Sequence, residues 1–314
     1  MIEVRDLTKD YGPRKAIQQL NFTVNKGEVV GFLGPNGAGK STTMKIITGF
    51  MAPSSGTAKV AGFDVFESPL EVKKRIGYLP ETPPVYMDMY VRDYLVYVAE
   101  LKQVPRENIQ KQVENALEKT NLGSVQNRLI QNLSKGYRQR VGIAQALVSN
   151  PEVLILDEPT VGLDPKQVAE IRELIKQLRG HHTVILSTHI LSEVQATCER
   201  VIIINQGQIV AQDRIENLAN QERGQSRLTI RLRKEVEDFK KVLNGIEGVV
   251  AVSAGNSHRD WEVGFRGDDA VVDAISARVV NEGLGLLELS PRKVDLEDVF
   301  LKLTYGAEQT EVQS

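Results

Sequence analysis

The sequence is short of cysteine, and this shortage excludes several classes of protein. Its 314 residues contain one Cys and one Trp. Because Cys198 has no second cysteine to pair with, an internal disulfide is impossible, and zinc sites that need several cysteines are excluded. Nothing in the composition requires an oxidising compartment, so the expected compartment is the cytosol.

The sequence also has little net charge. Its 39 Lys and Arg residues nearly balance its 41 Asp and Glu residues, which gives a formal net charge of -2. This balance removes the long-range attraction on which non-specific nucleic-acid binders and polybasic membrane anchors depend. We therefore expect no nucleic-acid partner.

Long hydrophobic runs are missing as well. No apolar run reaches the length of about 18 residues that indicates a transmembrane helix. The richest apolar stretch, Thr183 to Ser192, contains His189, and the N-terminal segment carries charges from Glu3 onward. A signal peptide needs an apolar stretch that this segment lacks. The expectation is a chain that is not exported and does not span a membrane by itself.

The composition that is present is that of a folded protein. Hydrophobic residues make up 41% of the chain and charged residues 25%. Because a domain typically holds about 100–200 residues, the length predicts two domains.

Short apolar runs alternate with helical segments from Met1 to about Gln221. Runs of consecutive apolar residues are typical of strands buried on both faces of a parallel sheet. The runs are Val29–Leu33, Ile76–Leu79, Val153–Leu156 and Val184–Leu186. The alternation predicts an α/β fold.

Two segments depart from this rhythm. Ile2–Leu7 and Leu20–Val24 alternate apolar with polar residues, which predicts an N-terminal antiparallel β layer. Within residues 82–150 the pattern predicts three successive helices, over Val91–Gln103, Arg106–Thr120 and Lys135–Ser149. We interpret this stretch as a helical subdomain inserted into the α/β core.

A polar segment around residues 220–226 is the expected linker between a first domain, residues 1–222, and a second, residues 226–305. The second domain shows a β-α-β-β-α-β order, which predicts a small α+β ferredoxin-like domain. The expected elements are Arg227–Arg233, Glu235–Leu243, Val249–Ala254, Trp261–Phe265, Asp268–Asn281 and Leu284–Leu289. A closing helix over Asp295–Thr304 is expected to dock through its apolar face, and residues 306–314 are expected to form a flexible tail.

A glycine-rich segment follows the first buried strand and matches the phosphate-loop pattern G-x-x-x-x-G-K-[ST]. Its residues are Gly34, Pro35, Asn36, Gly37, Ala38, Gly39, Lys40, Ser41 and Thr42. The glycines permit a tight loop whose N–H groups converge on phosphate oxygens at the positive end of the next helix. Lys40 can reach the β- and γ-phosphates, and Ser41 can ligate Mg²⁺.

Two carboxylates stand at the end of another buried strand. Asp157 follows Val153–Leu156, at the carboxyl end where open α/β sheets bind ligands, and can hold Mg²⁺ through water. Glu158 adds a carboxylate that can orient or deprotonate an attacking water. A plain polar strand end followed by a turn is the alternative, and the phosphate loop argues against it.

A further segment, Leu133–Arg140, resembles the signature motif of ABC ATPases, usually written LSGGQ. Other elements of that family follow in the family's order. Tyr11 resembles the aromatic residue that stacks on adenine, Glu81 stands in the place of the Q-loop, Asp164 ends a stretch similar to the D-loop, and His189 is similar to the switch histidine. The chain is identified as a member of the ABC ATPase family over residues 1–222, which implies the P-loop NTPase fold with ATP and Mg²⁺ as ligands.

The resemblance assigns roles to these residues. Glu158, His189, Lys40 and Glu81 would act in catalysis, and Ser41, Asp157 and Glu81 would face the metal. Tyr11, the phosphate loop, Ser134, Gly136 and Asp164 would bind the nucleotide. Ser134 reads as a helix N-cap and, with Gly136, would face the phosphates of an ATP held by a second subunit, so a homodimer or heterodimer is implied.

Two departures from the family pattern point to one group. Lys135 and Tyr137 replace residues that are usually Gly and Gln, and Glu81 replaces a Gln. Both departures are similar to the ABC-2 exporter group, which implies an ATPase subunit at the cytoplasmic face of the cell membrane with a separate permease. An importer ATPase with a C-terminal regulatory domain and a soluble ABC ATPase of translation or repair are the alternatives. The second domain is assigned to dimerisation or regulation, and the cargo is not predicted.

Tyrosines gather in front of the helical subdomain. Tyr90, Tyr94 and Tyr97 are spaced as the buried face of a helix, and we expect them in the core. In the loop before them, we expect Pro84, Tyr86 and Met87 to contact the permease.

Overall fold

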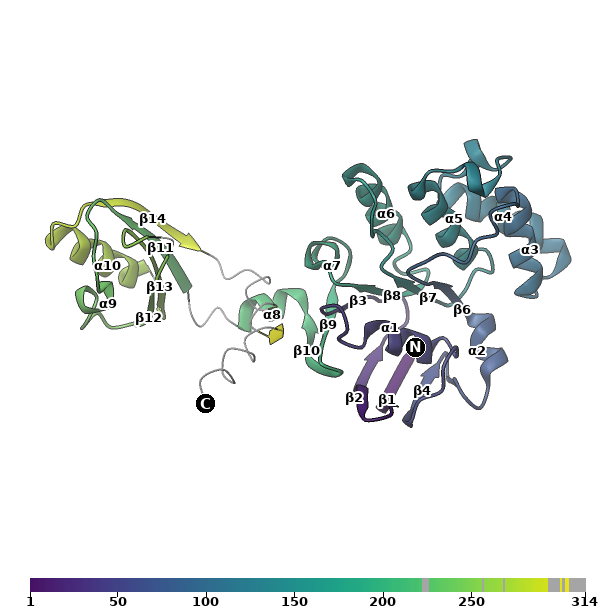
Figure 1. Cartoon of the computed structure of the whole chain (residues 1–314), viewed down its shortest axis with the longest axis horizontal. Helices are drawn as coiled ribbons and strands as arrows, with labels where there is room; N and C mark the ends of the chain where they lie inside the picture. Colours follow the sequence, from purple (N-terminus) through teal and green to yellow (C-terminus); the bar gives the residue numbers. More distant parts are fainter. Residues whose placement is uncertain (222–225, 256, 268, 293–299, 301–302, 305–314) are drawn as a thin grey trace. The chain divides into compact units, whose positions relative to one another are not determined.

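The computed structural model describes residues 1–221, 226–255, 257–267, 269–292, 300, 303 and 304. The chain forms two compact units, Met1–Arg214 and Ile215–Ser314 (Figure 1). The predicted closing helix, Asp295–Thr304, and the predicted tail, 306–314, lie almost wholly outside the described residues. The boundary predicted at residues 222 to 226 stays a prediction.

A six-stranded sheet forms the centre of the first unit. Its strands lie in the order β10 (Gln208–Arg214), β9 (Arg200–Asn205), β3 (Val29–Leu33), β8 (Thr183–Thr188), β7 (Val153–Asp157) and β6 (Ile76–Leu79). All neighbours pair in parallel except β10, which is antiparallel to β9. Every residue of β3, β7 and β8 is buried, as expected for apolar runs covered on both faces.

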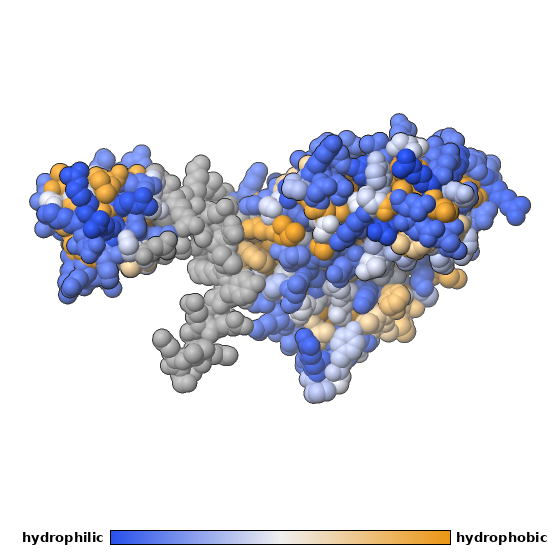
Figure 2. Space-filling model, turned by 45° about the horizontal axis from the view of Figure 1, so that its top comes forward, coloured by the Kyte–Doolittle hydropathy of each residue, from blue (hydrophilic) through white to orange (hydrophobic). Residues whose placement is uncertain are grey.

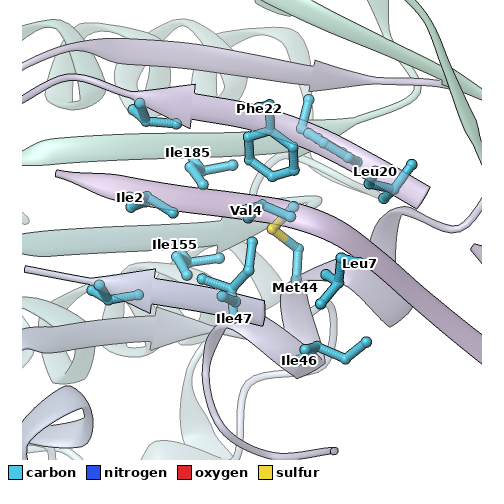
Figure 3. Close-up of a cluster of buried hydrophobic side chains, with 14 of the residues drawn as sticks. Ile2, Val4, Leu7, Leu20, Phe22, Met44, Ile46, Ile47, Ile155 and Ile185 are labelled. Carbon is cyan, nitrogen blue, oxygen red and sulfur yellow. The ribbon is translucent and has the colours of Figure 1, made fainter. Parts of the chain in front are cut away.

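The N-terminal antiparallel layer is confirmed. It is a sheet of four strands in the order β2 (Arg14–Val24), β1 (Ile2–Tyr11), β4 (Ser55–Val60) and β5 (Phe63–Asp64). Helix α1 (Lys40–Ile47) lies between this layer and the six-stranded sheet, and Met44 and Ile47 belong to one hydrophobic cluster with side chains of both sheets (Figures 1 and 3). Helices α6 (Pro165–Gln177) and α7 (Leu191–Thr197) lie on the opposite face of the six-stranded sheet (Figure 1).

The inserted helical subdomain is confirmed between β6 and β7. It follows the short helix α2 (Pro69–Arg75) and consists of α3 (Val91–Leu101), α4 (Arg106–Lys119), two short 3₁₀ turns (Gly123–Val125 and Ile130–Asn132) and α5 (Lys135–Leu147). These helices enclose a hydrophobic cluster of their own.

The prediction that three tyrosines of this subdomain are core residues is partly wrong. Tyr94 is buried, but Tyr90 is 48% exposed because it stands at the N-cap of α3, before the buried face of the helix begins. Tyr97 is half-buried and packs against Tyr86, with ring centroids 5.7 Å apart.

The second unit contains α8 (Ile215–Gln221) and a four-stranded antiparallel sheet. The elements after α8 are β11 (Ser226–Leu232), α9 (Phe239–Val242), β12 (Val249–Ala254), β13 (Asp260–Phe265), α10 (Asp269–Asn281) and β14 (Leu286–Arg292). This is the predicted β-α-β-β-α-β order, with the strands arranged β12-β13-β11-β14. Helix α9 is shorter than predicted because the Asp238 side chain caps its start by accepting a hydrogen bond from Lys241 N.

None of the helices among the described residues combines the length and the apolar character needed to span a bilayer.

Candidate functional site

The predicted phosphate loop connects β3 to α1. Gly39, its last residue, has a φ of 109°, a left-handed conformation that glycine adopts readily. A Cβ atom there would lie 2.8 Å from the Ala16 carbonyl oxygen and 2.7 Å from Ile17 Cγ2. The loop can therefore pack against β2 only with glycine at this position, and the packing turns Lys40 into the first helical position.

Lys40 is a buried cation with three oxygen partners. Its Nζ donates hydrogen bonds to the carbonyl oxygens of Gly34 (2.8 Å) and Pro35 (3.2 Å). It also lies 3.6 Å from Oε1 of Glu158, in an ion pair whose two side chains are both buried. Burial lowers the pKa of Lys40, and the Glu158 and Asp157 carboxylates oppose this shift. The ammonium group thus lies at the edge of the sheet where β7 ends, beside the carboxylates of Asp157 and Glu158.

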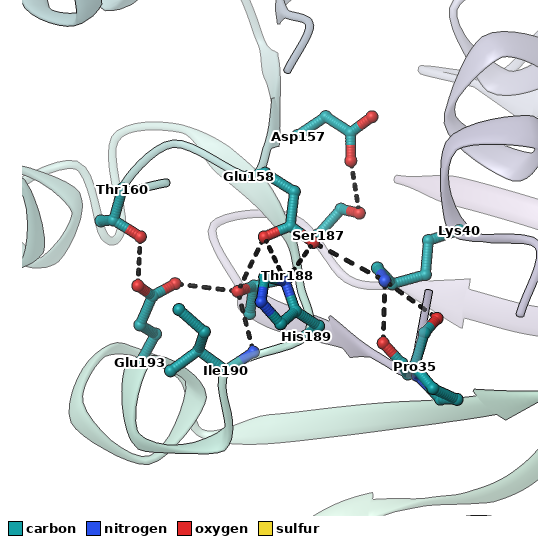
Figure 4. A network of polar contacts seen from close by, with 11 residues as sticks. Pro35, Lys40, Asp157, Glu158, Thr160, Ser187, Thr188, His189, Ile190 and Glu193 are labelled. Carbon is teal, nitrogen blue, oxygen red and sulfur yellow. Dashed lines mark hydrogen bonds and ion pairs between the residues drawn. The ribbon is translucent and has the colours of Figure 1, made fainter. Parts of the chain in front are cut away.

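Glu158 stands directly after β7 with a φ of 50°, in the left-handed region. Its backbone N–H donates to the Ser187 carbonyl at 2.8 Å, which fixes this turn against β8. Both carboxylate oxygens lie 3.0 Å from Nδ1 of His189. Figure 4 shows the His189 ring beside the Glu158 carboxylate. The structure therefore brings together Lys40, Glu158 and His189, three side chains predicted from separate parts of the sequence.

Asp157 is the last residue of β7 and is almost fully buried. Ser187 Oγ donates to its carboxylate at 2.7 Å. Burial raises the pKa of Asp157, whereas hydrogen bonds from Ser187 and Ser41 oppose the rise. The Asp157 carboxylate, at the end of β7, is thus hydrogen-bonded to the Ser41 hydroxyl of the phosphate loop.

These oxygen ligands fit Mg²⁺, which proteins usually bind through one or two carboxylates together with phosphates and water. Within the part of the chain that the structure describes, no three His, Cys, Asp or Glu side chains form a metal cluster. Asp157 and Ser41 offer one carboxylate and one hydroxyl oxygen to such an ion, which leaves room for phosphate and water ligands.

A pocket with a volume of about 880 Å³ opens beside these residues. The predicted site residues that line it are Tyr11, Asn36, Gly37, Gly39, Lys40, Ser41, Thr42, Glu81, Glu158 and His189. The volume suits a nucleotide-sized ligand, since small-molecule sites are typically about 300–1,000 Å³.

Several lining residues were not predicted. They are Arg14, Lys15, Ala16, Val161, Gln206 and Gly207. The two cations, Arg14 and Lys15, are the first residues of β2 and lie close in sequence to Tyr11. Gln206 and Gly207 reach the pocket because Gln18 N donates to the Gly207 carbonyl at 2.8 Å, a contact between distant segments.

The residues of the signature and D-loop regions lie elsewhere. Ser134 caps α5 by accepting from Tyr137 N at 3.4 Å, and Asp164 caps α6 by accepting from Gln167 N at 2.9 Å. A Cβ at Gly136 would meet the end of the Gln167 side chain, so α5 and α6 begin side by side. Ser134, Gly136 and Asp164 are not among the residues that line the pocket. Within one chain, the structure does not unite them with Lys40.

Comparison with known proteins agrees with this geometry. Residues 17–161 match the family described as ABC transporter. The chain is 32% identical over 308 residues to the bacitracin transport ATP-binding protein BcrA of Bacillus licheniformis, covering 98% of each chain. It is 30% identical over 305 residues to the linearmycin resistance ATP-binding protein LnrL of Bacillus subtilis (strain 168), covering 97% of this chain and 98% of that protein.

Solved structures give the same result. The dimeric post-hydrolysis state of the ATP-binding cassette MJ0796, bound to ADP and Pi, superposes with a TM-score of 0.62 at 25% identity, covering 68% of this chain and 98% of that chain. An ATP-binding subunit of an ABC transporter superposes with a TM-score of 0.65 at 29% identity, covering 71% and 93%. The fold, the pocket and these relatives together show that the chain belongs to the ABC transporter family, as an ATP-binding and ATP-hydrolysing subunit with the P-loop ABC ATPase fold.

Proposed function

We propose that this subunit powers an ABC-2-type exporter by forming a dimer when ATP binds. Its membrane partner would be a separate permease, with the subunit at the cytoplasmic face of the membrane. Support comes from two relatives of nearly full-length overlap, one named for bacitracin transport and one for linearmycin resistance. The transported compound of this chain is left open by both names.

Glu158 carries the hydrolytic part of the proposal. It would accept a proton from the attacking water, and its position beside Lys40 and His189 supports this role. Lys40 would exchange its contacts with the Gly34 and Pro35 carbonyls for phosphate oxygens, since an ammonium group binds a phosphate more strongly than a neutral carbonyl. His189, with its exposed side chain at the rim of the pocket, would contact the γ-phosphate.

Ser41 and Asp157 would hold Mg²⁺, with Glu81, which also lines the pocket, as a further carboxylate facing the ion. The ion would supply positive charge to the phosphate oxygens. Tyr11 would stack on the adenine, an exposed ring at the pocket edge being suited to this contact.

Dimerisation would complete the site. Ser134, Gly136 and Asp164 lie outside the pocket of their own chain, and the solved dimer of the MJ0796 cassette supports an arrangement in which a second chain supplies them. The N-terminus of α5 favours an anion, because the helix dipole is positive there.

We also infer that the loop before α3 contacts the permease. Tyr86 and Met87 are exposed there, while Tyr94 behind them is buried and donates to the Pro84 carbonyl at 3.0 Å. Residues 226–305 would act as an accessory domain in dimerisation or regulation, which the separate hydrophobic cluster of that unit supports.

The replacement Glu158→Gln tests the assigned base. It removes the proton acceptor while keeping size and hydrogen-bonding capacity, so we expect kcat for ATP hydrolysis to fall by about 10²–10⁴-fold with ATP still bound. Steady-state ATPase assays and a nucleotide-binding titration measure both effects. Hydrolysis at the parent rate would show that another group is the base.

Two further variants act as controls for Glu158→Gln. Glu173→Gln, an exposed glutamate on α6, makes the same chemical change and should leave kcat unaltered. Lys40→Ala removes the phosphate-binding cation and should abolish ATP binding, so unchanged nucleotide affinity would contradict the role of the phosphate loop.

A further inference from the structure

Glu193 is a buried carboxylate that does not line the nucleotide pocket. It lies on α7 and is 2% exposed. Among the residues that the structure describes, no Lys, Arg or His forms an ion pair with it. Because burying an unpaired charge is costly, the hydrogen bonds around this carboxylate must compensate for the lost hydration.

Two threonine hydroxyls supply those hydrogen bonds. Thr160 Oγ1 donates to Oε1 of Glu193, and Thr188 Oγ1 donates to Oε2 at 2.9 Å (Figure 4). Thr160 follows Glu158 by two residues, and Thr188 directly precedes His189. Glu193 thus holds both segments that carry the proposed catalytic side chains.

The Thr188 hydroxyl has a second possible acceptor. Its oxygen lies 3.3 Å from Oε2 of Glu158, compared with 2.9 Å from Oε2 of Glu193. A hydroxyl carries one proton and can donate it to one of the two carboxylates. The shorter distance favours Glu193, and the Ile190 N–H, which donates to Thr188 Oγ1 at 3.1 Å, fills an acceptor position of the same oxygen.

We propose that Glu193 is a positioning residue for hydrolysis: by accepting the hydrogen bond of the Thr188 hydroxyl, it keeps Oε2 of Glu158 free to accept a proton from water. The bond from Thr160 fixes the other oxygen of Glu193, so that Oε2 faces Thr188. This inference rests on the proposed role of Glu158 as the base. It adds that a hydroxyl next to the base must be turned away from it.

The replacement Glu193→Gln tests the inference. With the amide oxygen kept in the place of Oε1, where it still accepts from Thr160, the amide nitrogen faces Thr188 and donates to its oxygen, so the hydroxyl proton turns to Glu158. We expect kcat for ATP hydrolysis to fall by about 10–100-fold, the usual cost of losing a partner that orients a functional group. The KM for ATP and the affinity for ATP should stay unchanged, because Glu193 does not touch the pocket.

A double variant separates this effect from structural damage. Thr188→Val removes the hydroxyl itself, so no proton can turn to Glu158, and the kcat of this single variant is the reference for the double variant. Glu193→Gln combined with Thr188→Val should therefore regain the kcat of Thr188→Val, since the group that blocks the base is gone. Glu199→Gln, an exposed glutamate paired with Arg179, is the matched control and should behave as the parent.

The outcomes are decisive in both directions. Recovery of kcat in the double variant supports the proposal, whereas a parent-like kcat in Glu193→Gln, or a further loss in the double variant, overturns it. If Glu193→Gln does not fold, as seen by circular dichroism, Glu193→Asp serves instead: its shorter side chain releases the Thr188 proton, and the same recovery is expected. If the Glu193 variants contradict the proposal while Glu158→Gln is inactive, only the role of Glu193 is wrong. If Glu158→Gln hydrolyses ATP at the parent rate, the assignment of Glu158 as the base is wrong as well.

Discussion

At the scale of single residues, the site depends on burying polar groups close to one another. Lys40, Asp157 and Glu158 are all buried, and each is held by a named hydrogen bond or ion pair. The sequence predicted these three from motif spacing, because a phosphate loop and a strand-end carboxylate have local patterns. It could not predict Glu193, since a single glutamate on a short helix has no pattern that reveals burial beside two hydroxyls.

The burial of His182 leads us to expect that the stability of the fold depends on pH. Its Nδ1 donates to the Pro151 carbonyl at 2.7 Å, while Nε2 has no partner among the described residues. Burial lowers the pKa of His182 below its ordinary value of 6.5. In the pH range between the folded and the unfolded pKa, the unfolded chain binds the proton more readily, so stability is lost as the pH falls below about 6.5.

The replacement His182→Asn checks this effect, because its amide can still donate to Pro151 but does not titrate. Urea unfolding at about pH 7.5 and about pH 5.5 should show a larger loss of stability in the parent than in the variant. Equal losses in both proteins would assign the acid sensitivity to other groups.

At the scale of elements, the apolar runs predicted all four buried strands, but with the correct limits for only two of them: β7 is one residue longer than predicted, and β8 extends beyond Val184–Leu186 at both ends. Strands β3 and β6 begin and end where the sequence predicts, because a run covered on both faces has sharp ends. Strands β1 and β2 are longer than predicted, since their outer halves form an exposed hairpin with register shifts that no apolar alternation marks. The turn between β9 and β10 reaches the pocket through backbone hydrogen bonds of Gly207 with Gln18 of β2 and with Ala38 of the phosphate loop, contacts that no local sequence pattern reveals.

One contact between elements predicts a steep loss of stability. Gly77 lies on β6 against α5, and a Cβ there would stand 2.0 Å from the Ala146 carbonyl oxygen. Because this neighbour is backbone, it cannot rotate away, and Gly77→Ala should cost about 1–3 kcal/mol of unfolding free energy.

Gly123→Ala is the control for this replacement, since no atom lies within 4 Å of a Cβ at that position. It should change the unfolding free energy by less than about 0.5 kcal/mol. Denaturant unfolding measures both variants, and equal effects would mean that the packing of α5 on β6 tolerates an extra methyl group.

At the scale of the whole molecule, the site is divided between two regions that one chain does not unite. The sequence indicated this division through family resemblance, and the structure supplies its physical basis. The pocket contains Lys40 and Glu158, whereas Ser134 and Gly136 lie at the start of α5, outside the pocket. Residue spacing alone does not reveal this division, because it depends on where the folded chain places α5 relative to the pocket.

Mixing two inactive variants tests this division. In a homodimer, a Lys40→Ala chain paired with a Ser134→Arg chain has one site with both defects and one site with neither. We expect ATPase activity to appear on mixing, although each variant alone is inactive. Activity that stays absent after mixing, with dimers present in sedimentation, would argue that this chain does not share its sites with a second copy.

The left-handed backbone of Glu158 has a consequence for protein engineering. Glutamate disfavours a φ of 50°, and holding it there costs about 1–2 kcal/mol, whereas glycine adopts this conformation freely. Selection for melting temperature alone should therefore favour glycine at this position, because glycine relieves the backbone strain. The same replacement would remove the carboxylate that ATP hydrolysis needs. Thermostabilised versions of this ATPase should be sought with residue 158 held constant, because at this position the conformational preference of the chain opposes its chemistry.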